Sequence, residues 1–179
     1  AYAEYVTDKD YEPGADLVTA SSNTVMIRTF SKIHGLAGLR VGWGYFPAPI
    51  AEILNRMRHP NNINTVAIAA ATAAIADRGH IAAVRAGNAE LRDWFTRELK
   101  QMGFAPPASH GNFVLLPFAS AHDAATTKEF LKTRGIVVRP MSAYGLDQCL
   151  RITLGTPEEM RVTIDRSEER RVGKECRSR

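Results

Sequence analysis

The chain has 179 residues, of which 45% are hydrophobic and 23% charged, which is the composition of an ordinary globular protein. Most of its +4 charge lies in residues 166–179, where six Lys or Arg stand against three Glu, so the nearly neutral remainder argues against a nucleic-acid partner. No apolar stretch is long enough to span a bilayer, no signal peptide is evident, and Cys149 and Cys176 have no metal or disulfide spacing. We therefore expect a cytoplasmic protein with no membrane partner.

Short apolar runs alternate with glycine- and proline-rich breaks in the first half of the chain. Residues 8–22 are polar and predict a loop or a short surface element. Residues 24–30 are largely β-branched and apolar, which predicts a buried strand, and residues 41–46 predict a second short strand. A proline-containing start and helical spacing of apolar residues predict a helix over 47–57, and an alanine-rich helix is expected over 65–77.

The second half opens with a long amphipathic helix, predicted over residues 81–102. A strand, a helix, two strands and a last helix are expected after it, at residues 112–118, 123–134, 136–139, 150–154 and from Thr156 onward. Thr156 suits the N-cap of that last helix, Pro157 its first position and Glu159 its third. This order predicts an α/β fold with a small C-terminal α/β sandwich, residues 81–165, after a first part formed by residues 1–80.

Residues 166–179 differ from the rest, because they are densely charged and have no periodic apolar positions. A helix that begins at Pro157 would need apolar residues beyond Ile164 in order to pack. We therefore expect residues 166–179 to be a non-native or disordered basic tail. Helical structure packed on the body at residues 168–178 would contradict this expectation.

The segment with the clearest chemical content is TFSKIHGLAGLR, residues 29–40. The predicted strand carries Thr29, Ser31 and Lys32 to its C-terminal end, where ligands of open α/β sheets bind. Arg40 follows across a glycine-containing loop, and hydroxyls together with a guanidinium suit a phosphate dianion. A desolvated lysine near another cation can lose its proton and form an imine. The alternative, that Lys32 and Arg40 are solvated surface charges, fits poorly with their apolar flanks.

This segment, continued to TFSKIHGLAGLRVG, resembles the cofactor-lysine motif of class I/II aminotransferases, and within them of histidinol-phosphate aminotransferases. AYAEY at residues 1–5 resembles the end of the family's DEAYxEY/F motif, and VRP at 138–140 precedes YGL at 144–146. CLRITLGT at 149–156 is similar to the family's LRITVGT signature. The resemblance covers residues 1–165. It implies the C-terminal part of the large domain of a fold type I pyridoxal-phosphate (PLP) enzyme, followed by the small domain.

The resemblance also implies a cofactor site. Lys32 corresponds to the lysine that holds PLP as a Schiff base and moves the proton during catalysis. Arg40, with Ser31 and Thr29, corresponds to the cofactor's phosphate site. Tyr2 resembles the tyrosine whose hydroxyl reaches the cofactor's phenolic oxygen, although an ordinary packing tyrosine is the alternative.

On the substrate side, Arg151 resembles the arginine that binds the carboxylate of glutamate or the phosphate of histidinol phosphate. For Arg151, an ordinary ion pair is the alternative. Arg139 stands where the family has a second anion-binding arginine, and for this residue anion binding and an ordinary structural role both stay open. The implied reaction is transamination between histidinol phosphate and 2-oxoglutarate in histidine biosynthesis, by way of imidazole-acetol phosphate and glutamate. Family members are homodimers.

Three alternatives remain for the function. The first is another aminotransferase, such as one for aromatic amino acids, and the second is a PLP-dependent decarboxylase that acts on an amino-acid phosphate. The third is a catalytically inert fragment. In the family, the aspartate that pairs with the cofactor's ring nitrogen precedes the residue that matches Ala1, so we expect the 179-residue chain to be inactive by itself.

Overall fold

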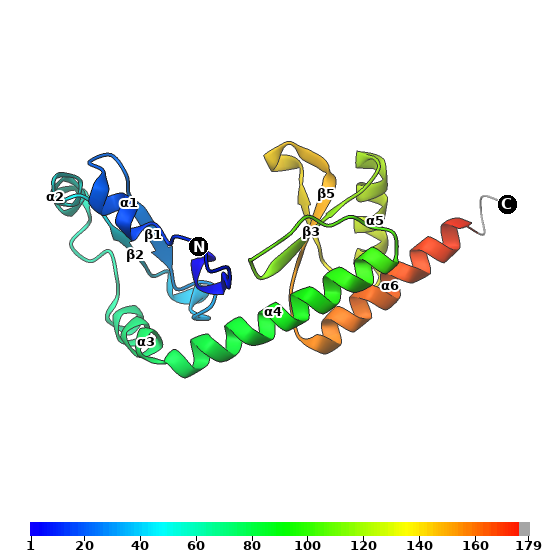
Figure 1. Cartoon of the computed structure of the whole chain (residues 1–179), viewed down its shortest axis with the longest axis horizontal. Coiled ribbons are helices and arrows are strands. Elements are labelled where there is room, and N and C mark those ends of the chain that lie inside the picture. The colour runs from blue at the N-terminus through cyan, green and yellow to red at the C-terminus, as the bar shows by residue number, and fades with distance from the viewer. Residues whose placement is uncertain (176–179) are drawn as a thin grey trace. The chain divides into compact units, whose positions relative to one another are not determined.

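The computed structural model describes residues 1–175, with side chains described for residues 1–169. The chain forms two compact units that meet in sequence between Ala86 and Gly87. This point lies within the long helix α4 (Arg78–Gln101), a few residues beyond the boundary expected near residue 80 (Figure 1). We call residues 1–86 the first unit and the residues from 87 onward the second unit, and describe each by itself.

A two-stranded antiparallel hairpin is the only sheet among the described residues of the first unit. Strand β1 (Met26–Thr29) pairs with β2 (Gly42–Tyr45), with Met26 opposite Tyr45 and Thr29 opposite Gly42. Gly42 is required by this pairing, because a Cβ atom there would lie 2.6 Å from the carbonyl oxygen of Arg28. The other elements of this unit are η1 (Ala3–Tyr5), α1 (Ala15–Ala20), η2 (Ala37–Leu39), α2 (Ala48–Met57) and α3 (Thr65–Ala76).

The expectation that residues 24–30 form a buried strand is wrong in one respect. The strand is present but shorter, and the side chain of Ile27 at its centre is 71% exposed. Among the described residues β1 has a single neighbouring strand, so its apolar side chains are only partly covered. The apolar sequence of the strand therefore does not guarantee burial in this chain.

The core of the first unit lies where the hairpin loop meets α3. Phe30, Val41, Ala67 and Ala71 are buried together, and the alanines allow α3 to pack closely. The helix begins where the side chain of Asn64 accepts a hydrogen bond of 2.8 Å from the Ala67 amide. This small core fixes the base of the segment that carries Lys32.

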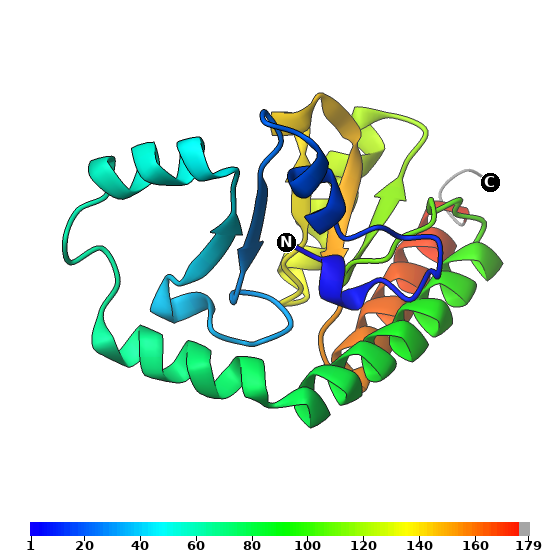
Figure 2. The same cartoon turned by 60° about the vertical axis from the view of Figure 1, so that its left-hand side comes forward.

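The second unit contains a three-stranded antiparallel sheet with strand order β3-β5-β4 (Figure 2). The strands and helices follow one another in the predicted order: β3 (Phe113–Pro117), α5 (Ala121–Thr133), β4 (Arg139–Met141), β5 (Leu146–Thr153) and α6 (Pro157–Glu175). Two strand boundaries differ from the prediction, because β4 begins only at Arg139 and β5 already at Leu146. A turn through η3 (Ser142–Tyr144) and Gly145, whose φ of 70° favours glycine, brings β5 back alongside β4.

The core of the second unit is continuous. Alternate residues of β3 and β5 face it, and α4 contributes the predicted apolar stripe. Its fully buried side chains include Phe95, Leu99, Val114, Leu116, Leu131, Leu150 and Met160. In both views α6 runs beside the C-terminal part of α4 (Figures 1 and 2), so the sheet and three helices enclose one hydrophobic core.

Helix α6 begins with the predicted capping box. The Glu159 amide donates to the Thr156 hydroxyl at 3.2 Å, and the Thr156 amide donates to the Glu159 carboxylate at 2.7 Å. The helix then continues to Glu175, and Ser167 is buried and donates to the Thr163 carbonyl, so regular structure does not end at residue 166 as expected. Residues 176–179 lie outside the described residues, and the non-native origin of the tail stays a prediction.

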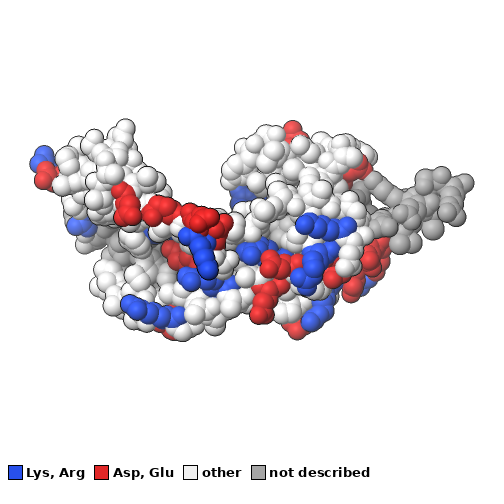
Figure 3. All heavy atoms as spheres, viewed as in Figure 1, with Lys and Arg blue, Asp and Glu red and all other residues white. Residues whose placement is uncertain are grey.

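Within residues 1–175, no single helix is long and apolar enough to cross a membrane; α3 and α4 pass that test only together, as a pair bent by 73°. No group of three or more His, Cys, Asp or Glu among the described residues could hold a metal ion. On the face drawn in Figure 3, acidic and basic side chains are interspersed over the surface of the second unit.

Candidate active site

Lys32 lies in the loop that joins β1 to β2. The register of the two strands continues past Thr29 and Gly42, because the Phe30 amide donates to the Val41 carbonyl at 3.2 Å. In this register Ser31 and Arg40 stand at the two ends of the loop. The hairpin therefore brings together Ser31 and Arg40, two of the predicted phosphate ligands, which are nine residues apart in sequence.

Hydrogen bonds fold the loop tightly around Lys32. The Gly35 amide donates to the Lys32 carbonyl at 2.9 Å, with Gly35 at a φ of 70°, and the Leu36 amide donates to the Phe30 carbonyl at 2.9 Å. Nε2 of His80, in the first turn of α4, lies 3.2 Å from the carbonyl oxygen of Ile33. A carbonyl oxygen can only accept, so this ring nitrogen carries the proton. Lys32 is half-buried, and these hydrogen bonds hold the backbone of its loop in place.

Arg40 has an unusual backbone conformation. Its φ of 52° makes it the one non-glycine residue with a positive φ among the described residues. Such strain persists only where the surrounding structure enforces it, and it occurs often at ligand sites. The Arg40 side chain is exposed and donates one hydrogen bond of 2.9 Å to the Ala37 carbonyl. The expectation that apolar flanks would bury this arginine is therefore wrong.

The two predicted hydroxyl ligands lie at the start of the same loop. Thr29 and Ser31 are half-buried, and the Ser31 amide donates to the Thr29 hydroxyl oxygen at 3.0 Å. This bond uses a lone pair of the threonine oxygen and leaves its proton able to donate. Both hydroxyls can thus serve as donors to an anion.

Tyr2 lies beside the lysine. It precedes η1, and Nζ of Lys32 is 5.9 Å from the centre of its ring. The Tyr5 ring follows, with its centre 6.4 Å from that of Tyr2. Burial raises the pKa of Tyr5 above its ordinary value of 10.0, and the nearby Tyr2 and Glu4 act in the same direction. Tyr5 therefore remains a neutral, packed support behind Tyr2.

The side chains of this loop have the chemistry that a phosphate-bearing aldehyde requires. Two hydroxyls and two cations, Lys32 and Arg40, come from one hairpin. Within the described residues no carboxylate forms an ion pair with either cation. A primary amine for the aldehyde and a guanidinium with hydroxyls for the dianion are therefore available, so the residues fit PLP.

The second unit brings the two other predicted site residues together. Arg139 on β4 lies directly opposite Arg151 on β5. Like charges at opposed positions are unfavourable unless an anion lies between them. Nε of Arg151 is buried without a hydrogen-bond partner, its guanidinium carbon lies 5.0 Å from the ring centre of Phe113, and no ion pair of Arg151 occurs among the described residues. The two guanidinium groups are therefore available to an anion, and their role as an anion-binding pair stays a prediction.

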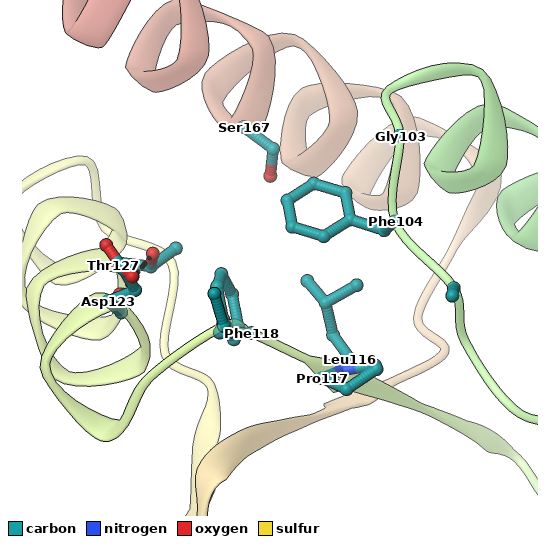
Figure 4. A pocket seen from close by; sticks show the side chains of 10 residues that line it. Gly103, Phe104, Leu116, Pro117, Phe118, Asp123, Thr127 and Ser167 are labelled. Atoms are coloured by element: carbon teal, nitrogen blue, oxygen red, sulfur yellow. Dashed lines mark hydrogen bonds between the residues drawn. The ribbon is translucent and has the colours of Figure 1, made fainter.

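A cavity of about 460 Å³ in the second unit includes none of the predicted site residues (Figure 4). Phe104 and Phe118, edge to face with ring centres 5.5 Å apart, and Leu116 form its apolar wall. Asp123 and Ser167 are among the polar residues that line it. The cavity is separate in its residues from both the lysine loop and the arginine pair.

Comparison with known proteins identifies the family. The family described as aminotransferase class I and II matches residues 1–166. The chain belongs to the class I and II aminotransferases. A relative in this family, the histidinol-phosphate aminotransferase of Paracoccus denitrificans, is 51% identical over 155 residues, which are 87% of this chain and 42% of that protein. The fold type I expectation is confirmed by the solved structures that the chain resembles.

Two solved structures have a similar fold over most of this chain. Histidinol-phosphate aminotransferase from Sinorhizobium meliloti, crystallised with pyridoxal-5'-phosphate, has a TM-score of 0.82 at 29% identity, and the match covers 92% of this chain and 45% of that one. L-threonine-O-3-phosphate decarboxylase from Porphyromonas gingivalis has a TM-score of 0.75 at 25% identity, covering 94% and 52%. The chain thus spans about half the length of the relatives it matches.

The contacts that hold the Tyr2 segment in place were not predicted from the sequence. Arg28 on β1 and Arg85 on α4 both bind this segment, as described below. An arginine in the middle of an apolar strand was a usable signal, because such a residue is seldom buried without a partner. Arg85 had no comparable signal, since it lies in a helix rich in charged residues.

Proposed function

We propose that this chain provides the lysine loop and the substrate-anion arginines of a PLP-dependent aminotransferase that acts on histidinol phosphate and 2-oxoglutarate. The observation that carries the proposal is the hairpin loop, in which Lys32 and the hydroxyl and guanidinium donors occur together without an acidic partner among the described residues. The 51% identity to the Paracoccus denitrificans protein supports the substrate assignment. A homodimer is part of the proposal and rests on the family resemblance alone, and the cytoplasmic location rests on the sequence features given above.

Lys32 has two roles in this proposal. Its Nζ atom would hold the cofactor at its aldehyde carbon, and the same amine, when free, would take the proton from the substrate's α-carbon and return it. When bound, PLP supplies an electron-withdrawing ring that stabilises negative charge at that carbon. The hydrogen bonds from Gly35, Leu36 and His80 hold the loop backbone while the lysine side chain moves.

The other side chains bind and orient. Arg40, Ser31 and Thr29 hold the cofactor's phosphate, and the Tyr2 hydroxyl donates toward its phenolic oxygen. Arg151 and Arg139 hold the anionic group of the substrate. A forked guanidinium can bind a carboxylate or a phosphate through two parallel hydrogen bonds, so the same pair can serve glutamate and histidinol phosphate in turn.

The proposal is tested in two steps. The 179-residue chain is mixed with PLP, and a visible absorbance band that borohydride removes, with the reduced adduct located on the Lys32 peptide by mass spectrometry, is the expected result. The matching segment of the Paracoccus denitrificans protein is then replaced by residues of this chain, and glutamate-dependent transamination of imidazole-acetol phosphate is measured. An adduct found only on other lysines, or an inactive chimera that binds PLP, would refute the proposal.

A decarboxylase is the second candidate, and the resemblance to L-threonine-O-3-phosphate decarboxylase is the observation that favours it. Both candidate substrates bear a phosphate, so the arginine pair does not separate them. The same chimera separates them by product: release of carbon dioxide from an amino-acid phosphate supports the decarboxylase, and transfer of an amino group from glutamate supports the aminotransferase.

A further inference from the structure

The Tyr2 segment is bound from two sides by arginines that have no role in the site described so far. Arg28 lies on β1, the strand that leads to Lys32, and Arg85 lies on α4. Nε of Arg85 donates a hydrogen bond of 2.6 Å to the backbone carbonyl of Glu4. One guanidinium nitrogen of Arg28 lies 3.8 Å from the carboxylate of the same glutamate. Two cations from distant parts of the sequence thus meet at one residue of η1.

Arg28 also holds the chain that follows η1. Its second guanidinium nitrogen donates to the Pro13 carbonyl at 2.6 Å, so one side chain binds both ends of the segment from residue 4 to residue 13. The Arg28 side chain is only 9% exposed. A buried guanidinium is strongly disfavoured unless its donors are satisfied, which makes these contacts specific rather than incidental.

We propose that Arg28 and Arg85 are positioning residues that hold η1, and with it Tyr2, against Lys32. Tyr2 immediately precedes η1, and the Tyr5 amide donates to the Tyr2 carbonyl at 3.0 Å. A bond to Glu4 therefore fixes the turn on which Tyr2 stands, two residues away. Arg28 lies on the strand that leads to Lys32 and binds the segment that follows Tyr2. It therefore connects the strand that carries Lys32 to the turn that carries Tyr2. The inference rests on the proposed role of Tyr2 toward the cofactor.

The first test needs no cofactor. In the 179-residue chain, Arg28→Met and Arg85→Met keep most of the side-chain volume but remove the donors. Hydrogen exchange of the Tyr5 and Val6 amides, which close the η1 turn, should become about tenfold faster, as expected for one lost charge-assisted hydrogen bond. Arg56→Met is the matched control, since Arg56 is 80% exposed and its one ion pair among the described residues is with Glu52 in the same unit. Unchanged exchange in both variants would overturn the inference.

The second test asks whether the arginines act through Tyr2. The PLP concentration that gives half-maximal borohydride trapping on Lys32 is measured for each arginine variant with Tyr2 present and with Tyr2→Phe. We expect a rise of about threefold to tenfold with Tyr2 present, and less than about twofold in the Tyr2→Phe background, because coupled residues are not additive. A general loss of stability would raise this concentration equally in both backgrounds.

Equal effects in the two backgrounds, or no effect of Tyr2→Phe alone, would overturn the positioning role. The failure of the proposed function has a different signature. If the unsubstituted chain gives no adduct on Lys32, the PLP assignment is wrong, and the amide exchange of Tyr5 and Val6 alone then decides whether Arg28 and Arg85 hold the turn.

Discussion

The two units differ in how they bury their apolar side chains. The second unit has one core of thirteen buried residues, whereas the main buried cluster of the first unit has four. Among the described residues, twelve of the large exposed hydrophobic side chains belong to the first unit and three to the second. Yet the first unit carries the candidate lysine and the backbone strain at Arg40. The candidate lysine therefore lies in the unit that has the smaller buried core.

This difference has a physical basis in the sheets. In the second unit, β5 lies between two partner strands and contributes Leu150 and Ile152 to a core that the helices cover. In the first unit, β1 and β2 pair only with each other among the described residues, and Ile27, Trp43 and Tyr45 remain exposed. An isolated hairpin is marginally stable in water, so local interactions such as the loop hydrogen bonds must hold the Lys32 segment.

The largest expected effect is on the chemistry of the first unit. In the chimera described above, Lys32→Ala should lower the rate of transamination by more than about a hundredfold, because it removes both the imine partner and the group that moves the proton. Lys9→Ala, an exposed lysine of the same unit, is the control. A Lys32→Ala variant that keeps more than about one hundredth of the rate would exclude this lysine as the catalytic one.

The next effect contrasts the two cores. Phe95 is fully buried, so Phe95→Ala should lower the free energy of unfolding of the second unit by about 3–5 kcal/mol. Phe30→Ala should cost the first unit less than about 2 kcal/mol, because its small core leaves little to form a rigid cavity.

Each unit has its own tryptophan, Trp43 in the first and Trp94 in the second, so urea unfolding can be followed separately by fluorescence in Trp43→Phe and Trp94→Phe backgrounds. Equal losses in the free energy of unfolding for Phe95→Ala and Phe30→Ala would show that the two cores contribute equally to stability, which would contradict this prediction.

The sequence predicted the second unit better than the first, and the reason lies in the kind of signal. The apolar stripe of α4, the strand and helix order and the capping box at Thr156 depend on neighbours that are close in sequence or repeat with a regular period. Burial of β1 and of Arg40 depends instead on what covers them, and no local pattern encodes this. The strand was therefore found, but its exposure was not.

In the candidate site, too, local features were predicted from the sequence and contacts between distant residues were not. The motif around Lys32 identified the loop, and the hairpin register then placed Ser31 and Arg40 at its two ends. The contacts of Arg28 and Arg85 with Glu4 join residues that are 24 and 81 positions apart, respectively. Contacts over this range have no periodic signature. The arginine in an apolar strand could indicate that Arg28 has a partner, but only the structure identifies Glu4 as the partner of both arginines.

A smaller effect separates the proposed cofactor arginine of the first unit, Arg40, from the proposed substrate arginine of the second, Arg151. In the chimera, Arg40→Ala should weaken PLP binding by about tenfold to a hundredfold, with activity partly restored by excess PLP. Arg151→Lys should raise KM for both substrates by a similar factor without such rescue, because an ammonium group cannot form the forked contact. Arg161→Lys, at an exposed ion pair with Glu158, is the control. Rescue of Arg151→Lys by PLP would mean that the two roles are exchanged.

The smallest effect tests whether the two units unfold separately. Thr156→Ala removes the N-cap of α6 and should lower the free energy of unfolding of the second unit by about 1 kcal/mol. Asn64→Ala removes the equivalent bond at α3 and should lower that of the first unit by about the same amount. Because the caps lie in different units, Trp94 fluorescence should report only the first substitution and Trp43 fluorescence only the second. If both probes shift equally for each substitution, the chain unfolds as a single cooperative structure, and the exposed apolar side chains of the first unit do not make it independently weaker.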